Sequence, residues 1–408
     1  MLVRSLKGTR LVVFALFLSI AGGRWGAWIG FPAQGLFIID LMFLFALFRS
    51  NISKIVSRDL LVIFYLAIFI IVELVVSNEF SLLTRVRDLA PFIYFILFIG
   101  LRRTILAIPR QTLFVALRAA TLLSLMWNLG KSFGILGEFT IANLTGIPVF
   151  SQRPDQFGFV AAIGIIVWCG KEFNYLFTPV LRNMIVFLFF LQVALLPGRA
   201  GSLAVISSII YLLISPAKNF QGNRFLGRRI VYGLLITVIL GSTISVFLPE
   251  QSALKRSGLI PGSDISRSSG QGTVNARISA QERVIEWTFE SNLEVFGAGP
   301  GREIVLESGA YKWLSGSVDV RQPHNWWVSL FSRFGFFGFF YWTFLVFYYL
   351  GPIKRSNLMQ PRIFILGAIL TTSTFGVILE SPFGLIPFYF FLMRNKEEFF
   401  DDRLMTTK

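Results

Sequence analysis

Long apolar runs recur along the whole length of this 408-residue sequence, and they limit the fold more than any other feature. A soluble domain could not bury so many of them in one core, because 54% of the residues are hydrophobic and only 15% are charged. The longer runs have the length of a membrane-spanning helix, and the shorter ones suit tilted, broken or paired spans. The runs are Leu11–Ile20, Leu36–Phe48, Leu60–Val76, Pro91–Gly100, Thr112–Leu129, Phe157–Gly170, Val180–Leu196, Ser202–Ile214, Ile230–Leu248, Trp326–Leu350, Ile363–Leu379 and Phe383–Met393. We therefore expect an all-α integral membrane protein with about twelve transmembrane helices.

Lys and Arg are distributed unevenly between successive loops, and this predicts how the chain is oriented in the membrane. With a cytoplasmic N-terminus, the cytoplasmic segments hold twenty-two of these residues, whereas the short loops on the opposite face hold six. Short loops rich in Lys and Arg are not readily translocated, so both termini are expected in the cytoplasm. The same distribution accounts for most of the net charge of +16. Since the basic loops carry no nucleic-acid recognition motif, we expect no nucleic-acid partner.

This topology divides the chain into three parts. Residues 1–248 would form the first nine spans, residues 249–325 an extracytoplasmic loop domain, and residues 326–408 the last three spans and a cytoplasmic tail. Within the loop, residues 257–271 are rich in Gly and Ser, which is typical of a mobile stretch or a lid. Residues 275–293 place apolar residues among charges at helical spacing, which predicts an amphipathic helix near the membrane face. The string from Gly297 to Gly301 predicts a tight turn, because no strand precedes it and Pro300 interrupts the dinucleotide-binding pattern.

His324 is the single histidine of the chain, and it lies where the polar loop meets a strongly apolar run. Histidine has the side chain whose ordinary pKa lies nearest neutrality, so His324 is a candidate for proton transfer in a partly dehydrated site. The alternative is an interfacial or core residue with one satisfied hydrogen bond.

Metal ligands are scarce on the extracytoplasmic face, where the sequence has one histidine and no Asp-x-Asp pair. We therefore expect no metal, and the absence of a phosphate-binding loop argues against nucleotide hydrolysis. Because nucleotides are not at hand outside the cytoplasm, group transfer there needs a substrate that is already activated, and lipid-linked phosphates or diphosphates are the obvious class. Without a metal, arginines would neutralise the departing diphosphate, since their planar fork pairs with phosphate oxygens.

Several arginines are expected on this face, and each has a structural alternative. Arg199 lies in a very short turn between two spans, where it could simply reach for the membrane surface. Arg277 and Arg283 belong to the predicted amphipathic helix and could be solvated charges paired with Glu282, Glu286 or Glu290. For Arg321 we favour a membrane-flanking anchor, and for the single cysteine, Cys169, packing within an apolar run.

Three strings occur in an order that resembles the O-antigen ligase and O-antigen polymerase superfamily over roughly residues 188–349. They are Pro197-Gly-Arg-Ala-Gly-Ser202, then Arg283-x-x-x-Trp287 followed by Phe296-Gly-Ala-Gly-Pro-Gly301, and then His324-Asn325 with Gly335 and Gly338 beyond it. The string Gln152-Arg-Pro-Asp-Gln-Phe-Gly158 is also similar to a stretch of that family. The family more often has Asn where Asp155 stands, which leaves the role of Asp155 open.

The resemblance implies a metal-independent, cofactor-free glycosyltransferase of the bacterial inner membrane with its active site on the periplasmic face. It would move a glycan from undecaprenyl diphosphate to an acceptor hydroxyl with inversion, as an O-antigen ligase does with lipid A–core in lipopolysaccharide assembly. Arg199 and Arg283 would then hold the diphosphate, with Arg277 as a further candidate, and His324 would be the general base. The membrane-spanning helices and the region near Trp287 would form a groove for the polyprenyl chain among the membrane lipids.

Other roles and functions stay open at this point. Asn325, Glu380 and Arg153 are candidate supporting residues, and Arg118 stands inside an apolar run, where a charge is costly unless it is paired or lines a wet groove. A polymerase, which passes the glycan to another lipid-linked unit, would need the same cations and base. A transporter of lipid-linked glycans would instead show internal repeats and ionisable residues near mid-membrane. The sequence shows no clear repeat, and the candidate residues gather at one face instead.

Overall fold

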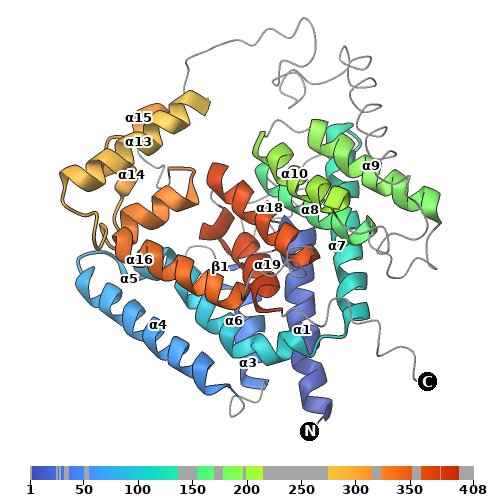
Figure 1. Ribbon diagram of the computed structural model, residues 1–408, viewed down its shortest axis with the longest axis horizontal. Helices are drawn as coiled ribbons and strands as arrows, with labels where there is room; N and C mark the ends of the chain where they lie inside the picture. The colour runs from blue at the N-terminus through green and yellow to red at the C-terminus, as the bar shows by residue number, and fades with distance from the viewer. Residues whose placement is uncertain are drawn as a thin grey trace, which may run out of the picture.

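The computed structural model describes residues 2–23, 26, 29–31, 36–49, 55–136, 154–169, 178–195, 199–214, 274–314, 323–351, 360–376 and 378–394. Over these residues the chain is helical, apart from one two-residue antiparallel pair in which β1 (Gly30–Phe31) lies beside β2 (Leu36–Phe37). The all-α class expected from the sequence is therefore confirmed (Figure 1).

Apolar sequence and helix coincide closely. The helices are α1 (Leu2–Ala21), α3 (Ile38–Arg49), α4 (Ser57–Val76), α5 (Leu82–Asp88), α6 (Ala90–Leu106), α7 (Arg110–Ser132), α8 (Pro154–Cys169), α9 (Pro179–Leu195), α10 (Arg199–Ile214), α13 (Val274–Glu290), α14 (Ile304–Glu307), α15 (Tyr311–Leu314), α16 (Trp326–Leu350), α18 (Pro361–Phe375), the 3-10 helix η5 (Ile378–Glu380) and α19 (Pro382–Met393). Each predicted apolar run overlaps at least one of these helices, except Ile230–Leu248, which lies outside the described residues. The predicted helix at residues 275–293 is α13, whereas residues 257–271 also lie outside.

Three of the described helices, α4, α7 and α16, are long and apolar enough to cross a membrane. A fourth span results if α5 and α6, which are bent by 62° relative to each other, count as one. The 20 residues of α4 extend about 30 Å, which matches the hydrocarbon thickness of a bilayer. Most of α4 is exposed despite its apolar sequence, including Leu60, Phe64 and Ile71. Exposed apolar side chains on a helix of this length are suited to contact with lipid. We therefore conclude that the protein is a membrane protein.

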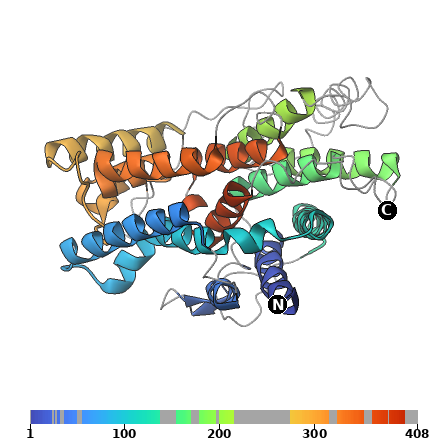
Figure 2. The same ribbon diagram turned by 60° about the horizontal axis from the view of Figure 1, so that its bottom comes forward.

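The short helix α19 lies at the centre of the bundle, and every residue from Pro382 to Met393 is buried (Figures 1 and 2). A helix that is hydrophobic on all sides has no polar face to present to water, so it packs inside. Its Tyr389 hydroxyl accepts a hydrogen bond from Trp342 Nε1 at 2.9 Å and donates one to the Pro91 carbonyl oxygen at 2.8 Å. One side chain thereby joins α16, α19 and α6.

Helices α8 and α10 cross at a glycine of each helix. A Cβ atom at Gly158 would overlap the backbone of Gly201, so only glycine permits this approach. Gly158 ends the string that begins at Gln152, and Gly201 belongs to the string that contains Arg199. Two strings that are far apart in sequence therefore meet near the beginnings of their helices.

Candidate functional site

Hydrogen bonds of Asn325 connect the beginning of α16 to α13. Its Oδ1 accepts hydrogen bonds from the backbone N–H groups of Trp327 at 2.9 Å and Val328 at 3.4 Å, which makes Asn325 the N-cap of α16. Its Nδ2 donates to Oε1 of Gln281, on α13, at 3.1 Å. Asn325 therefore has a structural role, which is to hold the N-terminal end of α16 against the helix that carries Arg277 and Arg283.

His324 directly precedes this cap and has an unusual backbone conformation. Its φ is 55°, in the left-handed region that residues other than glycine seldom adopt, and its side chain is half-buried. Strained residues of this kind gather at functional sites, where the surrounding structure holds them in place. The geometry is compatible with the proton-transfer role expected for His324.

Helix α16 is broken at Gly335, and a glycine-rich turn completes its hydrogen bonding. The backbone N–H groups of Ala298 and Gly299 donate to the carbonyl oxygens of Ser332 and Arg333, both at 2.8 Å. In the opposite direction, Phe336 N donates to the Glu294 carbonyl oxygen at 2.7 Å. Since a break in a helix frees main-chain groups, the turn at residues 294–299 satisfies groups that would otherwise be orphaned.

Glycine is required on both sides of this contact. Gly297 and Gly335 have φ values of 77° and 60°, and a Cβ atom on either one would overlap the backbone of the other segment. The tight turn expected at residues 297–301 is confirmed. Close packing against α16 explains Gly297, whereas an added Cβ at Gly299 would meet Ser77 and one at Gly301 would meet Phe80.

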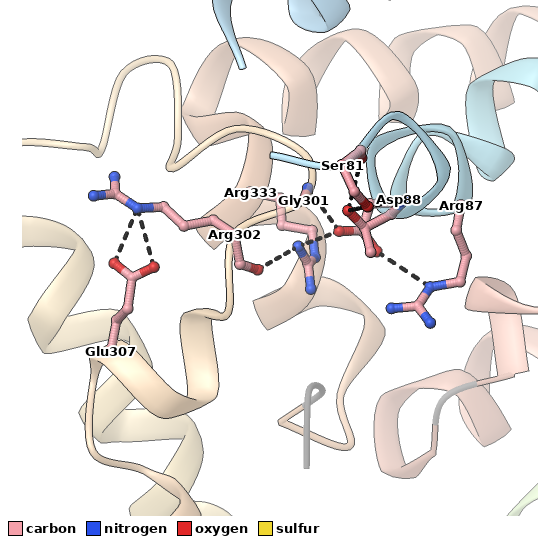
Figure 3. A network of polar contacts seen from close by, with 8 residues as sticks. Ser81, Arg87, Asp88, Gly301, Arg302, Glu307 and Arg333 are labelled. Atoms are coloured by element: carbon pink, nitrogen blue, oxygen red, sulfur yellow. Dashed lines mark hydrogen bonds and ion pairs between the residues drawn. The ribbon is translucent and has the colours of Figure 1, made fainter. Parts of the chain in front are cut away.

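A buried ion pair anchors the same turn to the end of α5 (Figure 3). Arg333 Nη1 lies 2.6 Å from Asp88 Oδ2 and donates to the carbonyl oxygen of Arg302 at 3.0 Å. Gly301 N donates to the same Asp88 oxygen at 2.9 Å, and Arg87 Nε lies 3.8 Å from Asp88 Oδ1. The side chains of Asp88 and Arg333 are only 1% and 4% exposed, so the pair is nearly shielded from water.

A small cavity lies beside this pair and brings Glu380 into the site. Its lining includes Arg87, Asp88, Trp326, Arg333 and Glu380. The space that the centre of a water molecule can occupy inside the cavity measures about 20 Å³. Both carboxylate oxygens of Glu380 are buried and lack a hydrogen-bond partner among the described residues. Glu380 thus lies with a charged cluster near the beginning of α16.

Burial has a large effect on the carboxyl group of Glu380. Desolvation raises the pKa of Glu380 from 4.5 to about 7. The nearby Ser329 hydroxyl and the charge of Arg333 offset part of the rise, although the hydroxyl does not meet the geometry of a hydrogen bond. Glu380 therefore changes its charge near neutral pH.

The two arginines of α13 lie in different environments. Arg283 has the ion pairs anticipated as its structural alternative, because its Nη1 lies 3.4 Å from Glu286 Oε2 and its Nη2 lies 3.1 Å from Glu290 Oε2. The hydrogen bond to Glu290 is the largest cause of a raised pKa for Arg283. Arg277 is exposed and lies one helical turn before Gln281, so the two residues share a face of α13. Arg283 is two residues from Gln281 and points to nearly the opposite side.

The remaining candidates are described in part or not at all. Arg199 begins α10 and Asp155 lies in the first turn of α8, but their side chains are outside what the structure describes. Arg153 and Arg321 lie wholly outside the described residues. Arg118 donates from Nε and Nη2 to the carbonyl oxygen of Val167 at 3.2 Å and lies over the ring of Trp168, so it stabilises the C-terminal end of α8.

Sequence reasoning missed Asp88 and Arg333, which form the centre of the charged cluster. Arg333 lies within the apolar run 326–350, where an ionisable residue is costly and calls for a partner. The same argument drew attention to Arg118 and could have drawn attention to Arg333. Among the described residues, no group of three His, Cys, Asp or Glu side chains is arranged to hold a metal ion.

Comparison with models of known protein families finds no match for this sequence, and no curated protein is significantly similar to it.

Proposed function

We propose that the protein is a membrane glycosyltransferase that moves a glycan from undecaprenyl diphosphate to a hydroxyl of an acceptor, with lipid A–core as the first acceptor to test. The observation that carries the proposal is the position of His324. It is held in a strained, half-buried conformation at the beginning of α16, and Asn325 binds that point to Gln281 of the helix that bears Arg277 and Arg283. A candidate base and candidate diphosphate ligands thus come from adjoining elements.

The proposed topology has about twelve spans in the bacterial inner membrane, with both termini in the cytoplasm and the loop domain in the periplasm. Contacts between distant segments support it. Asp88, Gly301, Arg333 and Glu380 gather around one ion pair and its cavity, and the charge distribution assigns all of their segments to the periplasmic side. Near the C-terminal end of α6, Arg102 binds Asp59 of α4, and both residues belong to segments assigned to the cytoplasm.

The proposed reaction is a single displacement at the anomeric carbon of the donor sugar. His324 takes the proton of the acceptor hydroxyl, the acceptor oxygen forms the new glycosidic bond, and the bond between the anomeric carbon and the diphosphate oxygen breaks. The diphosphate leaves with the bonding electrons, and arginines from α13 and from the beginning of α10 stabilise its charge. Attack opposite the leaving group inverts the anomeric configuration.

The test is transfer by the purified protein in lipid nanodiscs, supplied with a lipid-diphosphate-linked glycan and lipid A–core but no nucleotide. His324→Asn is the informative variant, because asparagine tolerates a left-handed backbone but cannot act as the base. We expect transfer to fall by roughly a hundredfold or more while the unfolding temperature changes little. Elongation of the lipid-linked glycan without use of lipid A–core would identify a polymerase. Movement of the lipid across the bilayer without any product would overturn the enzyme assignment.

A further inference from the structure

The cavity beside the Asp88–Arg333 pair is not used by the chemistry described so far. It lies between the end of α5, the beginning of α6, the first half of α16 and η5, and Arg87, Trp326 and Glu380 contribute to its lining. About 20 Å³ is open to the centre of a water molecule, which is room for one oxygen atom and its hydrogen. The side chain of Arg87 is 50% exposed, so the cavity reaches the surface of the protein.

Four buried polar atoms of the lining residues have no hydrogen-bond partner among the described residues. Trp326 Nε1 and Arg333 Nη2 are donors, and their residues are 2% and 3% exposed. Glu380 Oε1 and Oε2 are acceptors when the carboxyl group is ionised. Leaving such buried atoms unpaired is costly, so a cavity lined by the residues that carry four of them is suited to a polar ligand.

The mixture of donors and acceptors defines the chemistry of that ligand. An anion would meet the carboxylates of Asp88 and Glu380, and a cation would meet the guanidinium groups of Arg87 and Arg333. The two positive and two negative charges balance when Glu380 is ionised. A neutral hydroxyl group fits instead, because it donates one hydrogen bond and accepts others.

The cavity is also close to the proposed base. Trp326, which forms part of its wall, is the second residue after His324, and two residues of chain span at most about 7 Å. A sugar with one hydroxyl in the cavity could therefore present a neighbouring group toward His324.

We propose that this cavity is a hydroxyl-binding subsite for the acceptor sugar, in which Glu380 accepts a hydrogen bond from the hydroxyl while Trp326 and Arg333 donate to its oxygen. The inference rests on the proposed glycosyl transfer and names the part of the protein that selects the acceptor. Glu380, Trp326 and Arg333 are positioning residues in this scheme, because the proton of the attacking hydroxyl goes to His324.

The experiment measures the affinity of lipid A–core for the protein in nanodiscs without any donor, so binding is separated from transfer. Glu380→Gln retains the size of the side chain but replaces one acceptor oxygen by a donor group. Trp326→Phe retains a ring against Trp342 but removes the N–H group. Glu307→Gln is the matched control, since Glu307 forms an ion pair with Arg302 and does not line the cavity.

We expect Glu380→Gln to weaken acceptor binding by roughly tenfold or more, Trp326→Phe by roughly twofold to tenfold, and Glu307→Gln by less than about twofold. In the transfer assay, the KM for the acceptor should rise while the KM for the donor is unchanged. If Glu380→Gln does not fold, Trp326→Phe alone decides between the outcomes.

Unchanged affinity in both cavity variants, with wild-type protein still active, would mean that the cavity holds only water, and it would overturn the subsite alone. If the wild-type protein neither bound lipid A–core nor transferred glycan to it, the subsite would fall together with the ligase assignment.

Discussion

Buried arginines occupy both ends of the helical bundle, but their partners differ. At the end where α6, α16 and α19 terminate, Arg394 donates to the main-chain oxygens of Ile105 at 3.3 Å and Ile108 at 3.1 Å, and Arg362 donates to that of Leu350 at 3.0 Å. A positive charge at the C-terminal end of a helix complements the helix dipole. These arginines therefore hold helix ends together and have main-chain oxygens as partners.

At the opposite end, the buried arginine meets carboxylates. Arg333 binds Asp88, while Glu380 and the indole N–H of Trp326 lie at the adjoining cavity without hydrogen-bond partners among the described residues. Arginine content alone therefore does not identify a binding site. Unpaired polar atoms alone do not identify one either, since Arg362 Nε at the first end also lacks a hydrogen-bond partner among the described residues. The second end adds buried carboxylates and a cavity whose lining brings these groups together.

The largest expected effect comes from breaking the buried ion pair. Arg333→Met leaves the Asp88 carboxylate buried without its cation, so we expect the free energy of unfolding to fall by about 3–5 kcal/mol. The double variant Asp88→Asn/Arg333→Met should recover part of this loss. Denaturant titration in detergent measures both, with Arg394→Gln as the comparison from the other end. Equal losses for Arg333→Met and Arg394→Gln would remove the energetic distinction between the two ends.

The break in α16 provides the next effect. Gly335→Ala and Gly297→Ala combine an unfavourable left-handed backbone with overlap of the new methyl group and the opposite segment, so each should cost about 2 kcal/mol or more. Gly309→Ala is a matched control, because Gly309 has a φ of 75° but nothing lies within 4 Å of its added Cβ. We expect about 1 kcal/mol for the control. An equal loss in the free energy of unfolding for Gly309→Ala would mean that backbone strain accounts for the whole effect and that close packing adds nothing to it.

The pKa of Glu380 predicts how stability depends on pH. Because burial raises the pKa from 4.5 to about 7, the folded protein binds more protons than the unfolded chain between these pH values. Stability should therefore fall as the pH rises from about 4.5 to 7, by at most about 3 kcal/mol from this group. Glu380→Gln should flatten this part of the curve and be the more stable protein at pH 8. An unchanged slope in the variant would assign the titration to another group.

The sequence predicted the helices well because hydrophobicity is a local property. Each predicted apolar run within the described residues overlaps a helix, and the composition of the glycine turn after α13 predicted that turn. The Asp88–Arg333 pair joins residues 245 positions apart, and no local pattern specifies such a contact. The unpaired polar atoms of the residues that line the cavity could not be predicted for the same reason, since their surroundings depend on how α5, α16 and η5 pack. The role of Asn325 could have been predicted, because asparagine before an apolar helix is a common N-cap.

The smallest effects concern the two arginines of α13, which are candidate ligands of the donor diphosphate. Glu286 and Glu290 are exposed, and ion pairs with exposed partners contribute little to stability. Arg283 itself is half-buried and donates from Nε to the carbonyl oxygen of Ser308 at 3.1 Å, so Arg283→Gln should lower the free energy of unfolding by no more than one ordinary hydrogen bond contributes. Arg277→Gln should lower it less, because Arg277 is exposed.

Affinity for the lipid-linked donor should separate these two variants. Arg277 is about 40° around the helix from Gln281, whose partner Asn325 adjoins His324, whereas Arg283 is about 160° away. Arg277→Gln should therefore weaken donor binding more than Arg283→Gln does. The reverse order would mean that α13 turns when the donor binds, releasing Arg283 from Glu290. In that case Glu290→Gln should bind the donor more tightly than the wild-type protein, because the competing carboxylate is removed.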